Sequence, residues 1–165
     1  MKTRTTVAVF VVASAIAASA QTAKPAAKPP AAQHAMVNAS DLQWGQAPPS
    51  LPAGAQLAVL HGDPAAAGVP FVMRVKFPDG FKVPPHWHPS DENVTVIAGT
   101  LAAGVGETWD DSAMKTFNPG GFALMPAKTP HYVVAKGETI VQIHAVGPFA
   151  VTYVDPKDDP RKKPQ

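Results

Sequence analysis

The sequence predicts an all-β domain that folds as one antiparallel sandwich or barrel. Helical periodicity is hard to find, whereas short runs of β-branched and aromatic residues recur between prolines and glycines. Short strands at regular spacing, divided by turn residues, are typical of sandwiches and barrels. The expected strands are 57–60, 71–77, 93–98, 101–105, 115–117, 122–125, 131–135, 139–144 and 149–154.

The run 71–77, FVMRVKF, is the clearest of these strands. Its apolar residues recur at every second position, so one face of the strand should be buried and the other should be polar. Pro and Gly clusters separate the strands, and we expect the chain to turn at each of them. Other candidates for the core or for pocket walls are Val94, Val96, Leu124 and Met125.

The two ends of the chain differ in composition from the domain. Residues 1–20 read as a secretory signal peptide, because Lys2 and Arg4 precede an apolar run that ends in Ala-Ser-Ala. An uncleaved membrane anchor is the alternative reading of the same residues. We expect an Ala/Pro/Lys-rich linker at 21–36, a β-barrel domain at 37–154 and a loose, charged tail at 155–165. This organisation predicts a periplasmic or secreted protein with no membrane anchor after cleavage.

Charge and cysteine content narrow the function. The whole chain has 14 basic and 12 acidic residues, but the range 37–154 has six basic and nine acidic ones, a net charge of −3. No basic stripe suits nucleic acid, so we expect a small-molecule ligand or substrate instead. Cysteine is absent, which excludes disulfides, thiol catalysis and thiolate metal ligands. Any metal must therefore be bound by histidine and carboxylate.

The triplet His86-Trp87-His88 carries the strongest chemical signal. Side chains two apart on a strand share a face, so the two imidazoles can point to one place while Trp87 points away. Glu92 follows after a short loop, and His131 begins a later strand that can close against the first. Three imidazoles and one carboxylate form a ligand set for one divalent transition metal, Mn, Fe, Ni, Co, Cu or Zn, and the sequence does not choose among them.

The spacing of these residues resembles that of the cupin family. The first cupin motif, G-x5-H-x-H-x3-E-x6-G, matches Gly80, His86, His88, Glu92 and Gly99 at every position. The second, G-x5-P-x-G-x2-H-x3-N, matches at Gly120, Pro126 and His131. At the motif's second Gly this chain has Lys128, and at its Asn this chain has Ala135. Because Lys tolerates positive φ less well than Gly, we expect the turn before His131 to differ in shape.

The resemblance covers about residues 55–154 and implies a double-stranded β-helix, or jelly-roll barrel, as a single domain. It also implies that His86, His88, Glu92 and His131 bind the metal. With one or two coordination positions left open, we expect a metal-dependent oxidoreductase of the dioxygenase type that acts on a small molecule. A non-catalytic metal- or ligand-binding module is the alternative, and an isomerase or decarboxylase on the same site is a further one.

Two weaker expectations concern residues outside the motif. His144 alternates with Gln142 on a late strand, and if that face is interior it can act as a general base or orient a ligand. A structural histidine is the alternative reading of this residue. The family often pairs barrels through edge or exchanged strands, which implies a homodimer, with 41–46 as the candidate for the exchanged segment.

Overall fold

The structure is a computed structural model that describes residues 34–162. Residues 1–33 and 163–165 lie outside the described part, and with them the predicted signal peptide and most of the predicted linker. The described residues form one compact unit. Within the described residues, no helix is long and apolar enough to cross a membrane.

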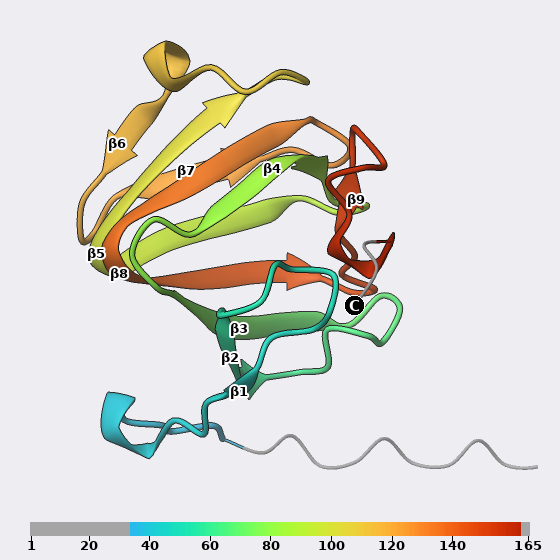
Figure 1. The fold of residues 1–165 in the computed structure, drawn as a ribbon. Coiled ribbons are helices and arrows are strands. Elements are labelled where there is room, and N and C mark those ends of the chain that lie inside the picture. Colours follow the sequence, from blue (N-terminus) through green and yellow to red (C-terminus); the bar gives the residue numbers. More distant parts are fainter. Residues whose placement is uncertain (1–33, 163–165) are drawn as a thin grey trace, which may run out of the picture. The chain divides into compact units, whose positions relative to one another are not determined.

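Nine strands within residues 34–162 curl into a barrel (Figure 1). Three single-turn 3-10 helices lie in the loops, η1 (Ala39–Asp41), η2 (Asp111–Ala113) and η3 (Pro160–Lys162). The strands are β1 (Gly45–Gln46), β2 (Gln56–His61), β3 (Pro70–Phe77), β4 (Lys82–Trp87), β5 (Glu92–Val105), β6 (Lys115–Phe117), β7 (Phe122–Met125), β8 (His131–Val146) and β9 (Thr152–Tyr153). The predicted all-β class and jelly-roll architecture are confirmed.

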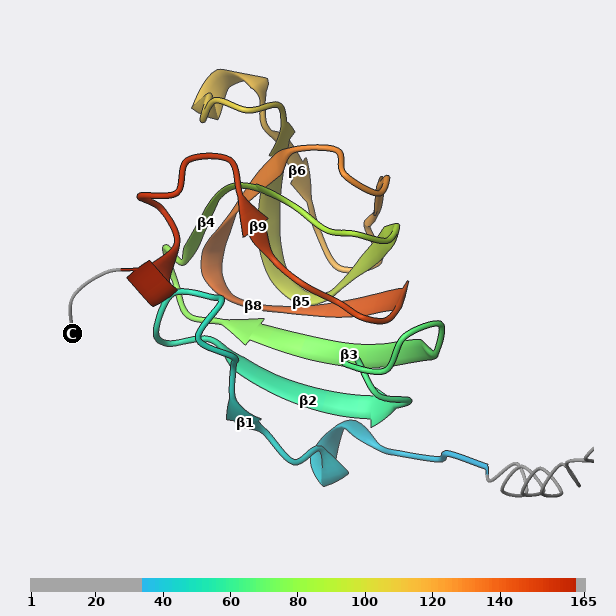
Figure 2. The same cartoon turned by 90° about the vertical axis from the view of Figure 1, so that its right-hand side faces the viewer.

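Two long strands, β5 and β8, form the centre of the barrel because each runs through both of its layers. They pair with each other along most of their length. In one layer, the second half of β8 pairs with β3 and the first half of β5 pairs with β7. In the other layer, the first half of β8 pairs with β4 and the second half of β5 pairs with β6. Figure 2 shows β1, β2 and β3 below β8, with β4 and β9 on the opposite side of the barrel.

The glycines at 99 and 137 bend these strands rather than end them. We expected turns at 98–100 and 136–138, but β5 and β8 continue through both positions. Each glycine has a φ of 75°, and a Cβ at Gly99 would collide with the backbone of Glu138. The fully buried Thr139 completes the bend, since its hydroxyl donates to the carbonyl of Thr100 at 3.0 Å. A glycine can therefore mark a bend inside one strand as well as a turn between two strands.

The core lies between the two layers, and the alternation in β3 is confirmed. Phe71, Met73, Val75 and Phe77 are all buried. Leu124 is a correction, because its side chain is 51% exposed while the neighbouring Met125 is buried. Adjacent residues on a strand face opposite sides, so the two could not both enter the core.

The C-terminal segment is better anchored than we expected. Asp159 is buried, and the side chain of Arg161 donates both to this carboxylate at 2.7 Å and to the carbonyl of Val151 at 3.1 Å. These bonds hold residues 155–162 against the barrel beside Val151, the residue directly before β9.

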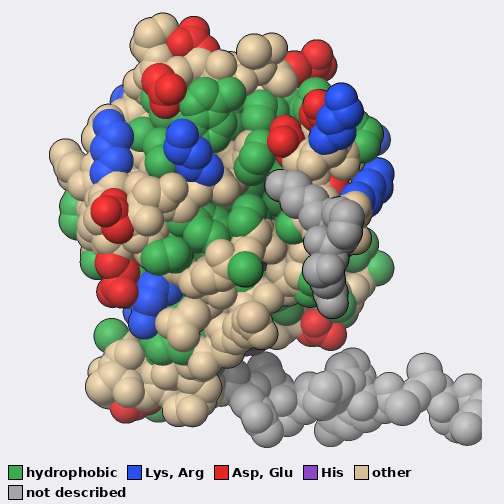
Figure 3. All heavy atoms as spheres, in the orientation of Figure 1, with side chains coloured by type: hydrophobic (Ala, Val, Ile, Leu, Met, Phe, Trp, Pro, Cys, Tyr) green, Lys and Arg blue, Asp and Glu red, His purple; other side chains and the backbone are tan. Residues whose placement is uncertain are grey.

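Charged side chains of both signs lie among hydrophobic ones on the face shown in Figure 3. The charge on this face is mixed and is not collected into one sign.

Candidate metal centre

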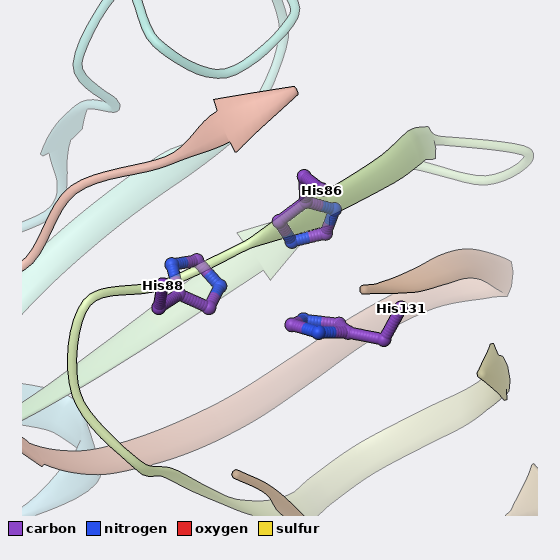
Figure 4. Close-up of side chains that lie close together, drawn as sticks. All are labelled: His86, His88 and His131. Atoms are coloured by element: carbon purple, nitrogen blue, oxygen red, sulfur yellow. The ribbon is translucent and has the colours of Figure 1, made fainter. Parts of the chain in front are cut away.

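The chain brings its four predicted metal ligands together on neighbouring strands at one end of the barrel. His86 on β4 lies directly opposite His131, the first residue of β8. His88 follows the last residue of β4, and Glu92 is the first residue of β5. The three imidazole rings converge on one point (Figure 4).

The geometry of the cluster is compact. One ring nitrogen from each of His86, His88 and His131 lies within 4.8 Å of the others. An oxygen of Glu92, Oε2, lies 3.5 Å from Nε2 of both His88 and His131. All four side chains are buried, with at most 6% of each residue exposed. Three imidazole nitrogens can therefore reach a single ion, and the carboxylate of Glu92 lies beside two of them.

Backbone carbonyls set the orientation of all three imidazoles. Nδ1 of His86 lies 2.7 Å from the carbonyl oxygen of Pro84, and Nδ1 of His88 lies 2.8 Å from that of Ala150. Nδ1 of His131 makes the same contact with Thr129 at 3.1 Å. A carbonyl oxygen can only accept, so each Nδ1 carries the proton and each Nε2 presents a lone pair. This is the arrangement by which a protein holds imidazoles ready for a metal.

Burial and the repulsion between charged imidazoles disfavour the protonated form of the histidines in the cluster. Burial, together with the positive charges that His131 and His88 would carry, lowers the pKa of His86 to about 3. Burial also lowers the pKa of His88, against the attraction of Glu92. Burial by itself raises the pKa of Glu92, but its interactions with the three histidines outweigh this and leave the pKa below the usual value. At neutral pH the site thus combines a negative carboxylate with neutral His86 and His88.

The donor set fits a divalent cation. Three Nε2 lone pairs and a carboxylate face one another, and none of these groups has a proton to share in the neutral tautomers. A cation bound among them would stabilise all of these buried acceptors at once. Nitrogen ligands with one carboxylate suit the transition metals better than Ca²⁺ or Mg²⁺, which prefer oxygen.

The two motif loops are bound to each other beside the cluster. The amide of Lys128 donates to the carbonyl of His88 at 2.8 Å, and the amide of Ala127 donates to Asp91 at 2.8 Å. Lys128 has a φ of 60°, the left-handed conformation that favours glycine. The expectation that Lys would avoid this conformation is therefore wrong, and the hydrogen bonds of this turn hold the residue in it.

A cavity of about 180 Å³ lies beside the cluster. Its walls are chiefly the inward side chains of β2, β3, β5, β7 and β8, together with residues from the loops. Phe149 lines it as well and stacks on His88, with ring centroids 4.3 Å apart and planes inclined by 15°. The polar groups of the site thus open into a mostly apolar space.

His144 does not belong to this site. The apolar residues Val141 and Ile143 of β8 face the cavity, so the alternate residue His144 points outward and is exposed. Its ring contacts the side chain of Gln142 at 2.9 Å on that outer face. A general-base or ligand-orienting role at the cluster is therefore corrected, because strand alternation places the side chain on the wrong face.

The aromatic neighbours of the ligands lie where strand alternation predicts. Trp87 is outside the cluster, half-buried on the opposite face of β4 from His86. Tyr132 is buried on the opposite face of β8 from His131, where its ring packs against Gly104 and its hydroxyl donates to the carbonyl of Asp110. Both residues support the sheet rather than the site.

Comparisons with known proteins agree with this fold. An RmlC-like cupin from Shewanella frigidimarina superposes with a TM-score of 0.53 at 13% identity, over 69% of this chain and 91% of that one. The chain has the fold of the cupins. It belongs to the family described as a domain of unknown function, DUF4437, whose model matches residues 6–152. No curated protein sequence matches it.

Two further structures show how widely this fold is shared. The chain is similar to the polyketide cyclase RemF from Streptomyces resistomycificus, with a TM-score of 0.59 and 18% identity over 78% of this chain and 90% of that one. A proposed acetylacetone dioxygenase from Methylibium petroleiphilum has the same TM-score and identity, over 77% and 85% of the two chains. At such identities the likeness concerns the fold and leaves the reaction open.

Sequence reasoning missed several residues that build the candidate site. Phe149 and the carbonyl of Ala150 reach His88 from the far end of the chain, and no local pattern marks them. Asp91 carried a usable signal, because an Asp directly before the ligand Glu92 in a Pro-Ser-Asp loop is a common side-chain acceptor for backbone amides.

Proposed function

We propose that this cupin binds one divalent transition-metal ion through His86, His88, His131 and Glu92, and that it acts as a small-molecule oxidoreductase with dioxygenase-like chemistry. One observation carries the proposal. Three Nε2 lone pairs, each oriented by a backbone carbonyl, converge with a carboxylate at the wall of an apolar cavity. Four protein ligands leave one or two positions of a five- or six-coordinate ion for exogenous ligands.

The protein's own residues would provide the conditions for this chemistry. The bound metal would activate oxygen or polarise an oxygen of the substrate. His86, His88 and His131 would hold it in place, and the apolar walls would exclude water and stabilise the substrate by burial. Similarity to a proposed acetylacetone dioxygenase is compatible with this function, but RemF shows that related barrels also serve a cyclase.

A non-catalytic binding module is the second candidate, and the cavity itself supplies the observation in its favour. Among the described residues that line it, the ionisable side chains are those of the four proposed ligands alone. A reaction that needs a separate proton acceptor would have to use the substrate, water or Glu92. An isomerase or decarboxylase on this site faces the same restriction.

The metal site is tested by the metal content of the protein. The chain, purified without a histidine tag, is expected to contain close to one equivalent of a transition metal by elemental analysis. His86→Ala and His131→Ala should reduce this content at least tenfold. His144→Ala removes an imidazole from the outer face and should leave the content unchanged. A purified chain that contains no metal and takes up none of Mn, Fe, Co, Ni, Cu and Zn would refute the site.

Oxygen uptake separates the oxidoreductase from the binding module. The chain, loaded in turn with each redox-active metal, is mixed with diketones, catechols, thiols and oxalate in an oxygen electrode. Uptake that disappears in His131→Ala supports the oxidoreductase. Substrate conversion without uptake would point to isomerase or decarboxylase chemistry, and ligand binding without conversion would point to the binding module.

We also propose that the protein is exported to the periplasm or the medium. The support is the basic, then apolar, then small-residue pattern of residues 1–20. Cell fractionation with mass spectrometry of the N-terminus tests this. An intact Met1 on protein found only in the cytosol would contradict it.

A homodimer is proposed as well. β7 pairs only with β5 among the described strands, and its outward residues Phe122 and Leu124 are 56% and 51% exposed. An apolar edge strand is stabilised when a partner covers it. Residues 41–46, the candidate for exchange, include β1, which pairs with β2 of its own chain here. Light scattering that gives a monomer mass at micromolar concentration would contradict the dimer.

A further inference from the structure

The walls of the cavity restrict what can bind beside the histidine cluster. Away from the cluster its lining is almost entirely aliphatic and aromatic, and includes Leu57, Met73, Val75, Val94, Val141 and Ile143. Ser50 supplies the one hydroxyl among the described lining residues, and neither Lys nor Arg is among them. A ligand therefore finds polar partners at one end only.

This asymmetry disfavours polar ligands. A sugar would bury several hydroxyls against Val and Leu side chains that cannot hydrogen-bond, and each unpaired group weakens binding. A phosphate, or a carboxylate directed away from the cluster, would meet no cation. The conclusion holds whether the bound molecule reacts or is merely held.

Charge limits the ligand further. A divalent ion among neutral imidazoles, with the carboxylate of Glu92 as the one charged protein ligand, has a net charge of +1. A ligand with a single negative charge neutralises this centre. A dianion would leave an excess negative charge in a low-dielectric cavity, which is costly without a counter-ion.

The volume sets the size. A dry, apolar cavity of about 150 Å³ accepts benzene, so the 180 Å³ here suits a molecule of roughly six to eight non-hydrogen atoms. A larger ligand would have to extend through the open side of the cavity or displace buried side chains of β3 and β8.

We propose that the site takes a small, apolar-bodied oxygen chelator with at most one negative charge, of which a 1,3-diketone is the simplest kind. Its oxygen atoms face the cluster formed by His86, His88, His131 and Glu92, and its hydrocarbon part contacts the β3 and β8 walls. This inference rests on the proposed metal site and names the substrate class for it.

Three molecules of equal size test the inference. Acetylacetone, acetoacetate and malonate each have seven non-hydrogen atoms and a 1,3-pair of oxygen groups, but successive methyl groups are replaced by carboxylate oxygen. Calorimetry with the Zn²⁺-loaded protein measures their binding without turnover. We expect acetylacetone and acetoacetate, which carry at most one negative charge, to bind at least tenfold more tightly than the dianion malonate.

Two substitutions on β7 show where the ligand binds. The side chain of Ala123 lines the cavity, whereas that of Leu124, the next residue, points outward. Ala123→Phe should fill the cavity and weaken acetylacetone binding at least tenfold while Zn²⁺ remains bound. Leu124→Phe is the matched control, since it adds an aromatic ring to the same strand on the outer face, and should leave both affinities unchanged.

The outcomes separate the two proposals. If Zn²⁺ binds but malonate binds as tightly as acetylacetone, the substrate class is wrong and the metal site survives. Zn²⁺ binding with no affinity for any of the three molecules at 10 mM, roughly the weakest binding that calorimetry resolves, also overturns the substrate class. A chain that fails to bind Zn²⁺ overturns the proposed metal site, and the inference with it.

Discussion

Acidification should destabilise the metal-free protein, chiefly through His86. In the unfolded chain this imidazole has the ordinary pKa of 6.5, whereas burial beside two other histidines lowers it to about 3 in the fold. Between these values the unfolded state binds a proton that the folded state does not. Stability therefore falls as pH drops below 6.5, and it continues to fall until pH reaches about 3.

The size of the effect follows from this difference in pKa. At pH 5 protonation of His86 in the unfolded state lowers the free energy of unfolding by RT ln(1 + 10^1.5), which is about 2 kcal/mol relative to pH 8. The full loss near pH 3 approaches about 5 kcal/mol, since each pKa unit corresponds to about 1.4 kcal/mol. The lowered pKa of His88 acts in the same direction, and that of Glu92 adds to the loss below pH 4.5.

Urea unfolding after EDTA treatment, followed by tryptophan fluorescence at pH 8 and pH 5, measures this loss. In His86→Leu the difference between the two pH values should shrink by about 2 kcal/mol. Val83→Ala is the control, because Val83 is an equally buried residue of β4 with no ionisable group, so it should lower stability equally at both pH values. Equal stability of the unsubstituted protein at pH 8 and pH 5 would refute the reasoning.

Three further predictions concern stability at other positions. Lys128→Gly should raise the free energy of unfolding by about 0.5–1 kcal/mol in urea titrations, because it relieves the left-handed strain at φ 60° and offsets the added chain entropy; a loss would show that the lysine side chain matters. Gly104→Ala should lower it by about 1–3 kcal/mol, since its methyl group would overlap the buried ring of Tyr132, and an unchanged midpoint would argue against that packing. Tyr153→Phe should cost about 1 kcal/mol at neutral pH through the lost bond to the carbonyl of Ser50. Burial raises the pKa of Tyr153 to about 12, so the unsubstituted protein should lose stability as pH rises from 10 to 12, and the variant should lack this part of the loss.

The candidate metal ligands were predictable because their geometry is local or follows the strand period. His86 and His88 share a face at a spacing of two, and Glu92 follows within one loop. His131 was recognisable from the second motif and from its place at the start of a strand. The same period of two correctly placed Trp87 away from the cluster.

The errors occurred where one local pattern allowed two outcomes. Alternation shows that His144 and Ile143 face opposite sides but does not state which side is interior. The apolar series Val141, Ile143 and Ala145 was the available signal, and the structure buries that series. Gly99 and Gly137 likewise fit either a turn between strands or a bend within one. Because β5 and β8 pair with each other on both sides of these glycines, each strand bends there and continues.

The sequence by itself determined the all-β class, the strand that carries two inward imidazoles, and the ligand types available in a chain without cysteine. These properties depend on residues a few positions apart, whose relative directions follow from backbone geometry. Only the tertiary structure decided that Phe149 stacks on His88, that the carbonyl of Ala150 orients its ring, and that the cavity wall lacks a cation. Each of these contacts joins segments about 60 residues apart or closes a surface from many strands, so it exists only after the barrel has closed.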